Sequence, residues 1–169
     1  NDRKEDLVVS APFYHGAGIG GAIFVYMNGP DGITSSTVPV KIVSPKMSQK
    51  ECDELGCQNS KFGLSLSSLG DIDLDGYDDL AVGAPFEGPG AVYIYRGSAT
   101  GIQEEYSQRI VSEELLLARP MVSFGSSVRG GMDMDGNGYP DLIVGAYESN
   151  KALILRSRPV IDVTSDYEI

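Results

Sequence analysis

Short apolar runs separated by turns rich in glycine and aspartate make up most of the chain. Runs such as Leu80–Gly83 and Leu142–Gly145 are too short for helices, and Asp and Gly bound them. Other runs are rich in β-branched and aromatic residues, which favour strands. Strands are therefore predicted at Ala22–Tyr26, Val40–Val43, Gly63–Leu69, Leu80–Gly83, Ala91–Tyr95, Arg109–Val111, Gly125–Arg129, Leu142–Gly145 and Ala152–Leu155. Glu113–Ala118 is predicted to form either a helical turn or a loop.

This pattern is repeated. A Phe-Gly pair begins each unit, at Phe62 and at Phe124, and leads into a serine-containing run and an acidic loop. Each loop ends on an aspartate, Asp79 or Asp141, and an apolar run follows. Both the Phe-Gly pairs and the closing aspartates are 62 residues apart. About four strands in some 60 residues are typical of one blade of a β-propeller.

A third copy of the repeat opens the chain. Asp2–Asp6 corresponds to the end of the acidic loop, and Leu7–Pro12 corresponds to the apolar run after it. This copy carries 11 extra residues, of which 4 are placed in Phe13–Gly21 and 7 between Ala22 and Phe62. Repeat architectures accept such insertions in loops.

Composition excludes several functions. The net charge of −11, from 24 acidic and 13 basic residues, argues against binding to a nucleic-acid backbone. No apolar run approaches the roughly 18 residues that a membrane span needs. The single histidine, His15, is predicted to lie in an exposed loop, and no catalytic set accompanies it. The chain is therefore predicted to be a non-enzymatic β protein that contacts neither nucleic acid nor membrane.

The repeated acidic loop has the chemistry of a calcium site. Calcium takes six to eight oxygen ligands from carboxylates and carbonyls, and alternate residues of a curled loop point inward. Glycine at position 76 or 138 permits the turn. The predicted ligands are Asp71, Asp73, Asp75, the Tyr77 carbonyl and Asp79 in one loop, and Asp133, Asp135, Asn137, the Tyr139 carbonyl and Asp141 in the other.

An EF-hand loop begins in the same way, but it needs a bidentate Glu at its twelfth position, between two helices. The twelfth positions here are Val82 and Val144, each inside a β-type run. The ninth position closes the loop instead, so the EF-hand is rejected.

The two cysteines, Cys52 and Cys57, lie in a polar stretch. A single Cys-x4-Cys pair lacks the second pair of a structural zinc site. A disulfide that closes a small loop, formed in an oxidising compartment, is the favoured interpretation. Two free thiols are the alternative.

Phe-Gly, a calcium loop and then Gly-Ala-Pro resemble the FG-GAP repeats of integrin α subunits, whose ectodomain begins with a seven-bladed β-propeller. Asp133–Tyr147 and then Ala152–Ile161 resemble the last blade and its exit into the Ig-like thigh domain. The resemblance implies an all-β fold of four-stranded antiparallel blades, about blades five to seven. The implied segments are the end of one blade with its linking strand and loops (1–61), a blade (62–123), the last blade (124–158) and the start of the thigh domain (159–169). Asp2, Lys4 and Asp6 are what remains of a third loop, in which Arg3 replaces the glycine.

The resemblance also implies a function. The segment would be a calcium-stabilised part of the head of a heterodimeric adhesion receptor, on the extracellular side of the plasma membrane in the ectodomain of a single-pass protein. Its partners would be an integrin β subunit and, through the complete head, an extracellular-matrix or cell-surface protein ligand. The alternative is the FG-GAP propeller of a secreted phospholipase that cleaves lipid anchors.

Overall fold

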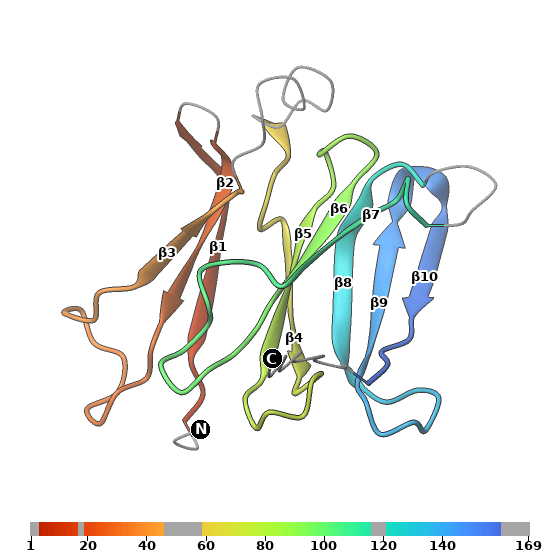
Figure 1. The fold of residues 1–169 in the computed structure, drawn as a ribbon. Helices are drawn as coiled ribbons and strands as arrows, with labels where there is room; N and C mark the ends of the chain where they lie inside the picture. The colour runs from red at the N-terminus through yellow and green to blue at the C-terminus, as the bar shows by residue number, and fades with distance from the viewer. Residues whose placement is uncertain (1–3, 17–18, 46–58, 116–120, 160–169) are drawn as a thin grey trace, which may run out of the picture.

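The computed structural model describes residues 4–16, 19–45, 59–115 and 121–159, and strands dominate it (Figure 1). The first sheet has the order β1 (Leu7–Gly16), β2 (Ile19–Tyr26) and β3 (Val40–Val43). The central sheet has the order β4 (Ser65–Gly70), β5 (Asp79–Ala84), β6 (Ala91–Tyr95) and β7 (Gln108–Val111). The third has the order β10 (Lys151–Leu155), β9 (Asp141–Ala146) and β8 (Phe124–Met132), with a short 3₁₀ helix, η2 (Tyr147–Ser149), between β9 and β10.

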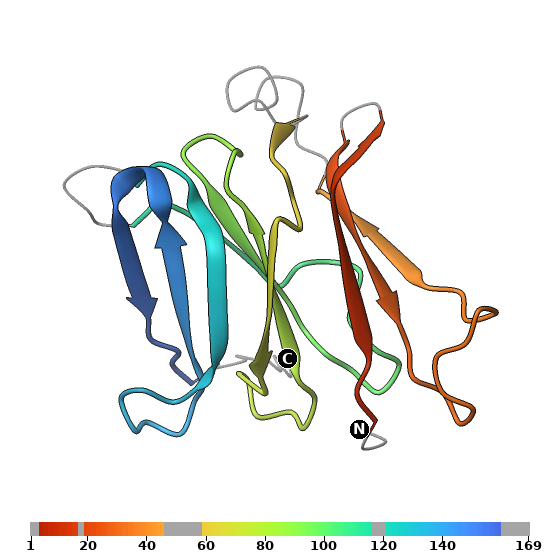
Figure 2. The same ribbon diagram turned by 180° about the vertical axis from the view of Figure 1, so that it is seen from behind.

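All the named strand pairs are antiparallel, and the three sheets stand side by side in both views (Figures 1 and 2). The all-β prediction is confirmed, with sheets of three or four strands. Strands β3 and β6 begin and end where the sequence predicts them. In the described part of 113–118 the chain forms a turn and not a helix. Among the described residues, no helix is long and apolar enough to cross a bilayer.

The hairpin of β1 and β2 differs from prediction. The extra residues after Pro12 do not form a separate loop, because β1 continues to Gly16 and pairs with β2 as far as Ile19. His15 was predicted to lie in a loop, but its backbone pairs with Gly20 inside this hairpin. Aromatic residues favour extended backbone, and the Tyr14 ring packs edge-on against Phe24 at 6.1 Å. The insertion therefore lengthens the hairpin.

The central sheet is buried on both faces, as the unbroken burial of β5 and β6 shows. Side chains alternate between the faces of a strand, so Leu80 and Val82 belong to one core and Ala81 belongs to the other. The first core also contains Ile23 and Ile42 of the first sheet. The second core contains, from the third sheet, Leu142, Val144 and Ala146.

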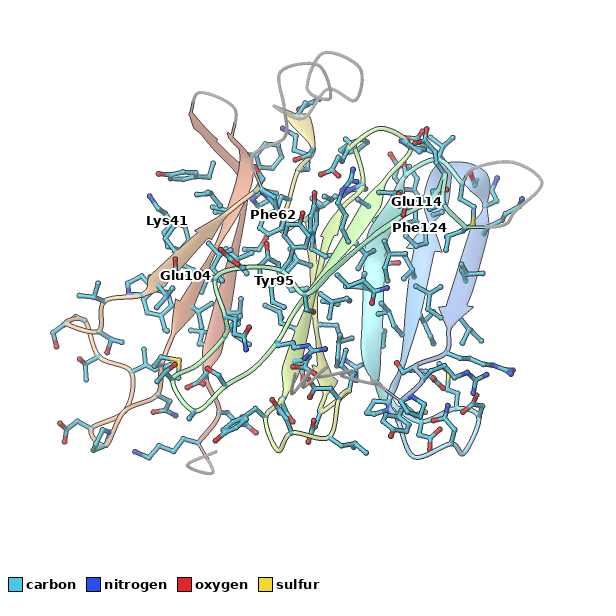
Figure 3. All side chains as sticks on the ribbon, viewed as in Figure 1. Lys41, Phe62, Tyr95, Glu104, Glu114 and Phe124 are labelled. Atoms are coloured by element: carbon cyan, nitrogen blue, oxygen red, sulfur yellow. The ribbon has the colours of Figure 1, made fainter. Side chains whose placement is uncertain are left out.

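Each Phe-Gly pair joins its own sheet to the preceding one. Phe62 makes a parallel bridge with Gly21, and Phe124 makes the same bridge with Gly90. Both phenylalanines are fully buried. Figure 3 shows Phe62 with Tyr95 between the first and central sheets, and their ring centroids are 6.1 Å apart. The aromatic residue that begins one repeat thus fills the core between its own sheet and the preceding one.

The outer faces of the first and third sheets carry apolar side chains that remain exposed. Leu7 and Val9 on β1 are 48% and 40% exposed, and Ile154 on β10 is 53% exposed. Leu80 and Val82 of the central sheet, which correspond to Leu7 and Val9, are buried against the first sheet.

Candidate metal centre

The two acidic loops lie at the same end of the sheets. One connects β4 to β5 and the other connects β8 to β9, and both are at the bottom of Figure 1. The opposite ends of these strands carry the Phe-Gly joints. The strands therefore separate the acidic loops from the upper connections.

The first aspartate of each loop holds the loop curled. The carboxylate of Asp71 accepts hydrogen bonds from the N–H groups of Asp75 at 2.9 Å and Gly76 at 2.7 Å. The carboxylate of Asp133 accepts from Asn137 at 3.1 Å and from Gly138 at 2.7 Å. These N–H donors, that of Gly138 foremost, lower the pKa of Asp133 because they stabilise its charged form. The turn needs a positive φ, which glycine adopts without strain: 95° at position 76 and 89° at position 138.

The closing aspartates are buried, with Asp79 2% exposed and Asp141 1% exposed. In Asp79, Oδ2 accepts the N–H of Ile72 at 3.0 Å and Oδ1 accepts the N–H of Gly97 at 2.8 Å. Burial raises the pKa of Asp79 to about 6, although both N–H donors act in the opposite direction and the charges of nearby aspartates add to the rise.

Asp141 repeats this arrangement. Its Oδ2 accepts the N–H of Met134 at 2.8 Å, and its Oδ1 accepts the N–H of Ser157 at 2.9 Å. Each closing aspartate therefore ties its loop to the backbone just beyond the second strand that follows it.

Three carboxylates converge in each loop. One oxygen from each of Asp71, Asp73 and Asp79 lies within 4.8 Å of the others, and Asp133, Asp135 and Asp141 form the equivalent group. Carboxylates this close repel one another, and a hard divalent cation that takes only oxygen ligands would relieve the repulsion. The carboxylate oxygens of both groups are the kind of ligand that calcium prefers.

Asp75 is not among the converging residues. Its Oδ1 accepts the N–H of Tyr77 at 2.9 Å, and the Oδ1 of Asn137 accepts that of Tyr139 at the same distance. Asn137 also donates from Nδ2 to the carbonyl of Ser157 at 2.9 Å. In this arrangement Asp75 and Asn137 brace their own turns, and ligation by them and by the Tyr77 and Tyr139 carbonyls stays a prediction.

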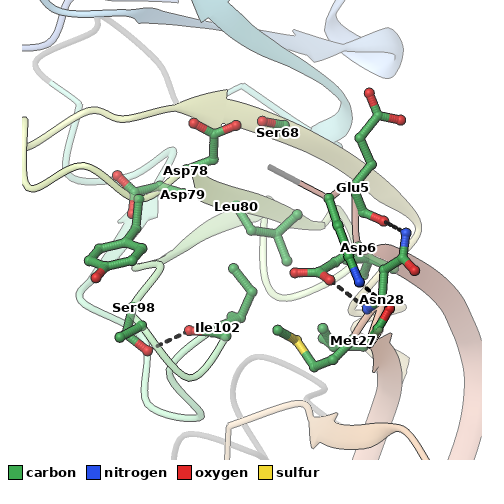
Figure 4. Close-up of a pocket in the computed structure, with 17 residues that line it drawn as sticks. Glu5, Asp6, Met27, Asn28, Ser68, Asp78, Asp79, Leu80, Ser98 and Ile102 are labelled. Carbon is green, nitrogen blue, oxygen red and sulfur yellow. Dashed lines mark hydrogen bonds between the residues drawn. The ribbon is translucent and has the colours of Figure 1, made fainter. Parts of the chain in front are cut away.

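The remains of the third loop line a cleft of about 860 Å³ between the first and central sheets (Figure 4). The Oδ1 of Asp6 accepts the N–H of Asn28 at 2.8 Å, which is the bond that Asp79 makes with Gly97. The ammonium of Lys4 donates to the carbonyl of Gly29. Asp2 lies outside the described residues.

Arginines at the loops were missed by the sequence reasoning. The Nη1 of Arg96 is 3.1 Å from Oδ2 of Asp73. In the second loop, Oδ2 of Asp135 is 3.9 Å from Nε of Arg156 and 3.6 Å from Nη1 of Arg158. The repeat contained a signal, because residues 96 and 156 each come directly after the second strand that follows a loop. Cys52 and Cys57, predicted as a disulfide, lie outside the described residues.

The model of the FG-GAP repeat matches residues 62–95 and 124–155. The chain is 42% identical to integrin alpha-7 of Mus musculus over 168 residues, which cover 98% of the chain and 13% of that protein. It is also 42% identical to integrin alpha-3 of the same species over 165 residues, or 96% of the chain and 14% of the relative. With integrin alpha-PS2 of Drosophila melanogaster it shares 51% identity over 110 residues, or 63% of the chain and 8% of the relative. The chain thus spans about an eighth of the length of its mouse relatives.

Proposed function

The chain belongs to the integrin α-subunit family, as a piece of its FG-GAP region, and from this premise we propose that it is a calcium-stabilised segment of a receptor head. The observation that carries the proposal is that three aspartate carboxylates converge in each of two equivalent loops on adjacent sheets. Calcium there would be structural: it would offset the repulsion among the aspartates and hold each loop against its sheet.

The proposed organisation follows the repeats. Residues 1–61 supply the end of one blade and its linking segments, 62–123 and 124–158 supply two further blades, and 159–169 begin the next domain. The exposed apolar faces of the first and third sheets support this proposal, because the central sheet buries the corresponding face against its neighbour. Further blades of a closed propeller would cover both outer faces in the same way.

The proposed context is that of an integrin. The segment is part of the extracellular region of a non-enzymatic membrane receptor that pairs with a β subunit, and the complete head binds a matrix or cell-surface protein. The relatives named above are integrin α subunits, and the similarity of the two mouse proteins extends over nearly the whole chain. This favours adhesion over the alternative of a phospholipase-associated propeller.

Calcium titration of the protein with its complete propeller tests the proposed sites. Asp79→Ala and Asp141→Ala each remove a closing carboxylate, so each variant should lose one binding step. Asp31→Ala is the control, since it removes an exposed carboxylate outside both groups. If both variants bind as many calcium ions as the parent protein, these loops are not the sites.

The extracellular location predicts a bond between Cys52 and Cys57. Alkylation under non-reducing conditions, followed by mass spectrometry, should leave both cysteines unlabelled, and reduction should expose both. Closing so short a loop stabilises the fold only modestly, by about 2 kcal/mol. Labelling of both thiols before reduction would contradict the prediction.

A further inference from the structure

Arg96 places a permanent positive charge against the first metal loop. It comes directly after β6, and its Nη1 lies 3.1 Å from Oδ2 of Asp73. The Asp73 side chain is 7% exposed and that of Arg96 is 32% exposed, so water screens the pair only in part. A guanidinium stays protonated at every physiological pH, and the charge is therefore always present.

Both carboxylate oxygens of Asp73 are engaged in this arrangement. Oδ1 accepts the N–H of Asp75 at 3.3 Å, while Oδ2 is held by Arg96. Asp73 is also one of the three residues whose oxygens converge. The guanidinium is thus bound to a carboxylate that a cation in the loop would need.

The other repeats vary this feature. In the second loop the two guanidinium groups are 3.6 Å and 3.9 Å from Asp135, and the side chains of Arg158 and Arg156 are 66% and 61% exposed. In the first repeat the residue directly after β2 is Met27, which carries no charge. Within one chain the same position therefore holds a close arginine, a distant arginine or none.

We propose that Arg96 is an internal cation that competes with calcium for Asp73 and thereby sets the calcium affinity of the first loop. The inference rests on the proposed function, because it takes the loop to be a calcium site. Without metal, Arg96 offsets part of the negative charge of the crowded aspartates. Calcium must overcome that ion pair, so its net affinity is lower than the four predicted aspartate ligands of this loop would otherwise give.

Arg96→Met tests the competition, since methionine is the residue at the corresponding position of the first repeat. Calcium titration of the protein with its complete propeller should show the first-loop step, which Asp79→Ala identifies, tightened by about fivefold; a partly exposed ion pair is worth roughly 1 kcal/mol. With calcium chelated, the same variant should melt at a lower temperature than the parent. Its melting temperature should therefore rise more on adding calcium.

Three further variants serve as controls. Lys151→Met also removes one positive charge, but at the start of β10, the end of the β9–β10 pair that lies away from Asp141 and its loop. This variant should leave the calcium affinity and the metal-free melting temperature unchanged. Arg96→Lys keeps the charge and should stay within about twofold of the parent affinity. Arg156→Met should change the calcium affinity of the second loop less than Arg96→Met changes that of the first, because the ion pair of Arg156 with Asp135 is longer and more exposed.

The results separate the two proposals. If Asp79→Ala removes a binding step but Arg96→Met leaves calcium affinity unchanged or weakens it, Arg96 does not compete and the inference is wrong. A metal-free melting temperature for Arg96→Met equal to that of the parent would contradict it as well. If Asp79→Ala removes no step, it is the proposed calcium site that fails.

Discussion

Gly90 has a φ of 123°, and a Cβ on it would lie 2.2 Å from the carbonyl oxygen of Phe124. Gly21 repeats this geometry, with a φ of 131° and the same 2.2 Å approach to Phe62. The two glycines let the backbone of the next repeat come close enough to form a bridge. A side chain at either position would be strained by the positive φ. It would also clash with backbone atoms, which cannot move aside as a flexible side chain can.

Gly90→Ala should therefore destabilise the protein by about 3 kcal/mol, the combined size of positive-φ strain and overpacking. Urea unfolding measures the change. The matched control is Gly29→Ala, because a Cβ on Gly29 would meet no atom within 4 Å and its φ is not in the left-handed region. Equal stability losses in the two variants would contradict the role assigned to the close approach.

At the level of elements, a buried ion pair ties the β5–β6 connection to β7. The Glu87 side chain is 2% exposed and lies 2.7 Å from Nη2 of Arg109. The hydroxyl of Tyr93 donates to both Glu87 oxygens, at 2.9 and 2.8 Å. Burial, together with the charge of Glu87, raises the pKa of Tyr93 far above its usual value. The tyrosine is thus a permanent hydrogen-bond donor to this carboxylate.

Arg109→Met should cost about 3 kcal/mol, because it leaves the Glu87 charge buried with no cation beside it. Adding Glu87→Gln should recover much of the loss by removing that charge. Arg129→Met, at an exposed position of β8, is the control and should change stability by less than about 0.5 kcal/mol. Thermal and urea unfolding should both give the largest stability loss for Arg109→Met, a smaller loss for the double variant and the smallest for Arg129→Met. A double variant no more stable than Arg109→Met would contradict the explanation.

The two loops should also differ in calcium affinity. The Asp71 loop has aspartate at four predicted ligand positions, whereas the Asp133 loop has three aspartates and an asparagine there, and a higher ligand charge favours calcium. Two effects reduce this advantage. Pro140 restricts the second loop, which favours calcium binding there by roughly 1 kcal/mol or less, and Arg96 opposes calcium in the first loop. The calcium affinities of the two loops should therefore differ only a few-fold. Asp141→Ala, which retains the Asp71 loop, should bind the remaining ion more tightly than Asp79→Ala. The reverse order would mean that rigidity and Arg96 outweigh charge.

The elements and the converging aspartates were largely predictable, because strand alternation and loop spacing are local properties of the chain. The ion pairs were not. Arg109 is 22 residues from Glu87, and it is placed by the register that pairs it with Tyr93. Arg96 reaches Asp73 only because β6 lies beside β5. The length of β1 was also missed, since the cross-strand packing of Tyr14 on Phe24 is invisible in a pattern of residue types.

For the whole molecule, the central sheet is packed on both faces, whereas the described residues cover only one face of the first and third sheets. Their outer apolar residues, such as Leu7 and Ile154, are available to neighbouring blades. In stacked repeats, stability is close to a sum of unit and interface contributions. Calcium bound as proposed would raise the contribution of the unit that holds it, and through that unit the stability of the stack.

Chelation should lower the melting temperature of the protein with its complete propeller. At a calcium concentration one hundred times the dissociation constant, each occupied site adds about 2.7 kcal/mol, which chelation removes. Calorimetry with EDTA, compared with EDTA already saturated with calcium, measures this loss. The loss should shrink in Asp79→Ala and in Asp141→Ala; an identical melting curve with and without calcium would contradict a structural role.

The placement of Phe62 and Phe124 has an evolutionary consequence. Each phenylalanine begins one sequence repeat and lies in the core that its own sheet shares with the sheet before it. A duplicated or exchanged repeat, cut at its Phe-Gly pair, would bring its own acidic loop, and its phenylalanine would have to fit a core that the preceding repeat helps to form. Its acceptance would depend on the glycine of the preceding repeat, Gly21 or Gly90, as well as on its own strands. Recombination among blades is thus constrained at a position one repeat away from the segment that moves.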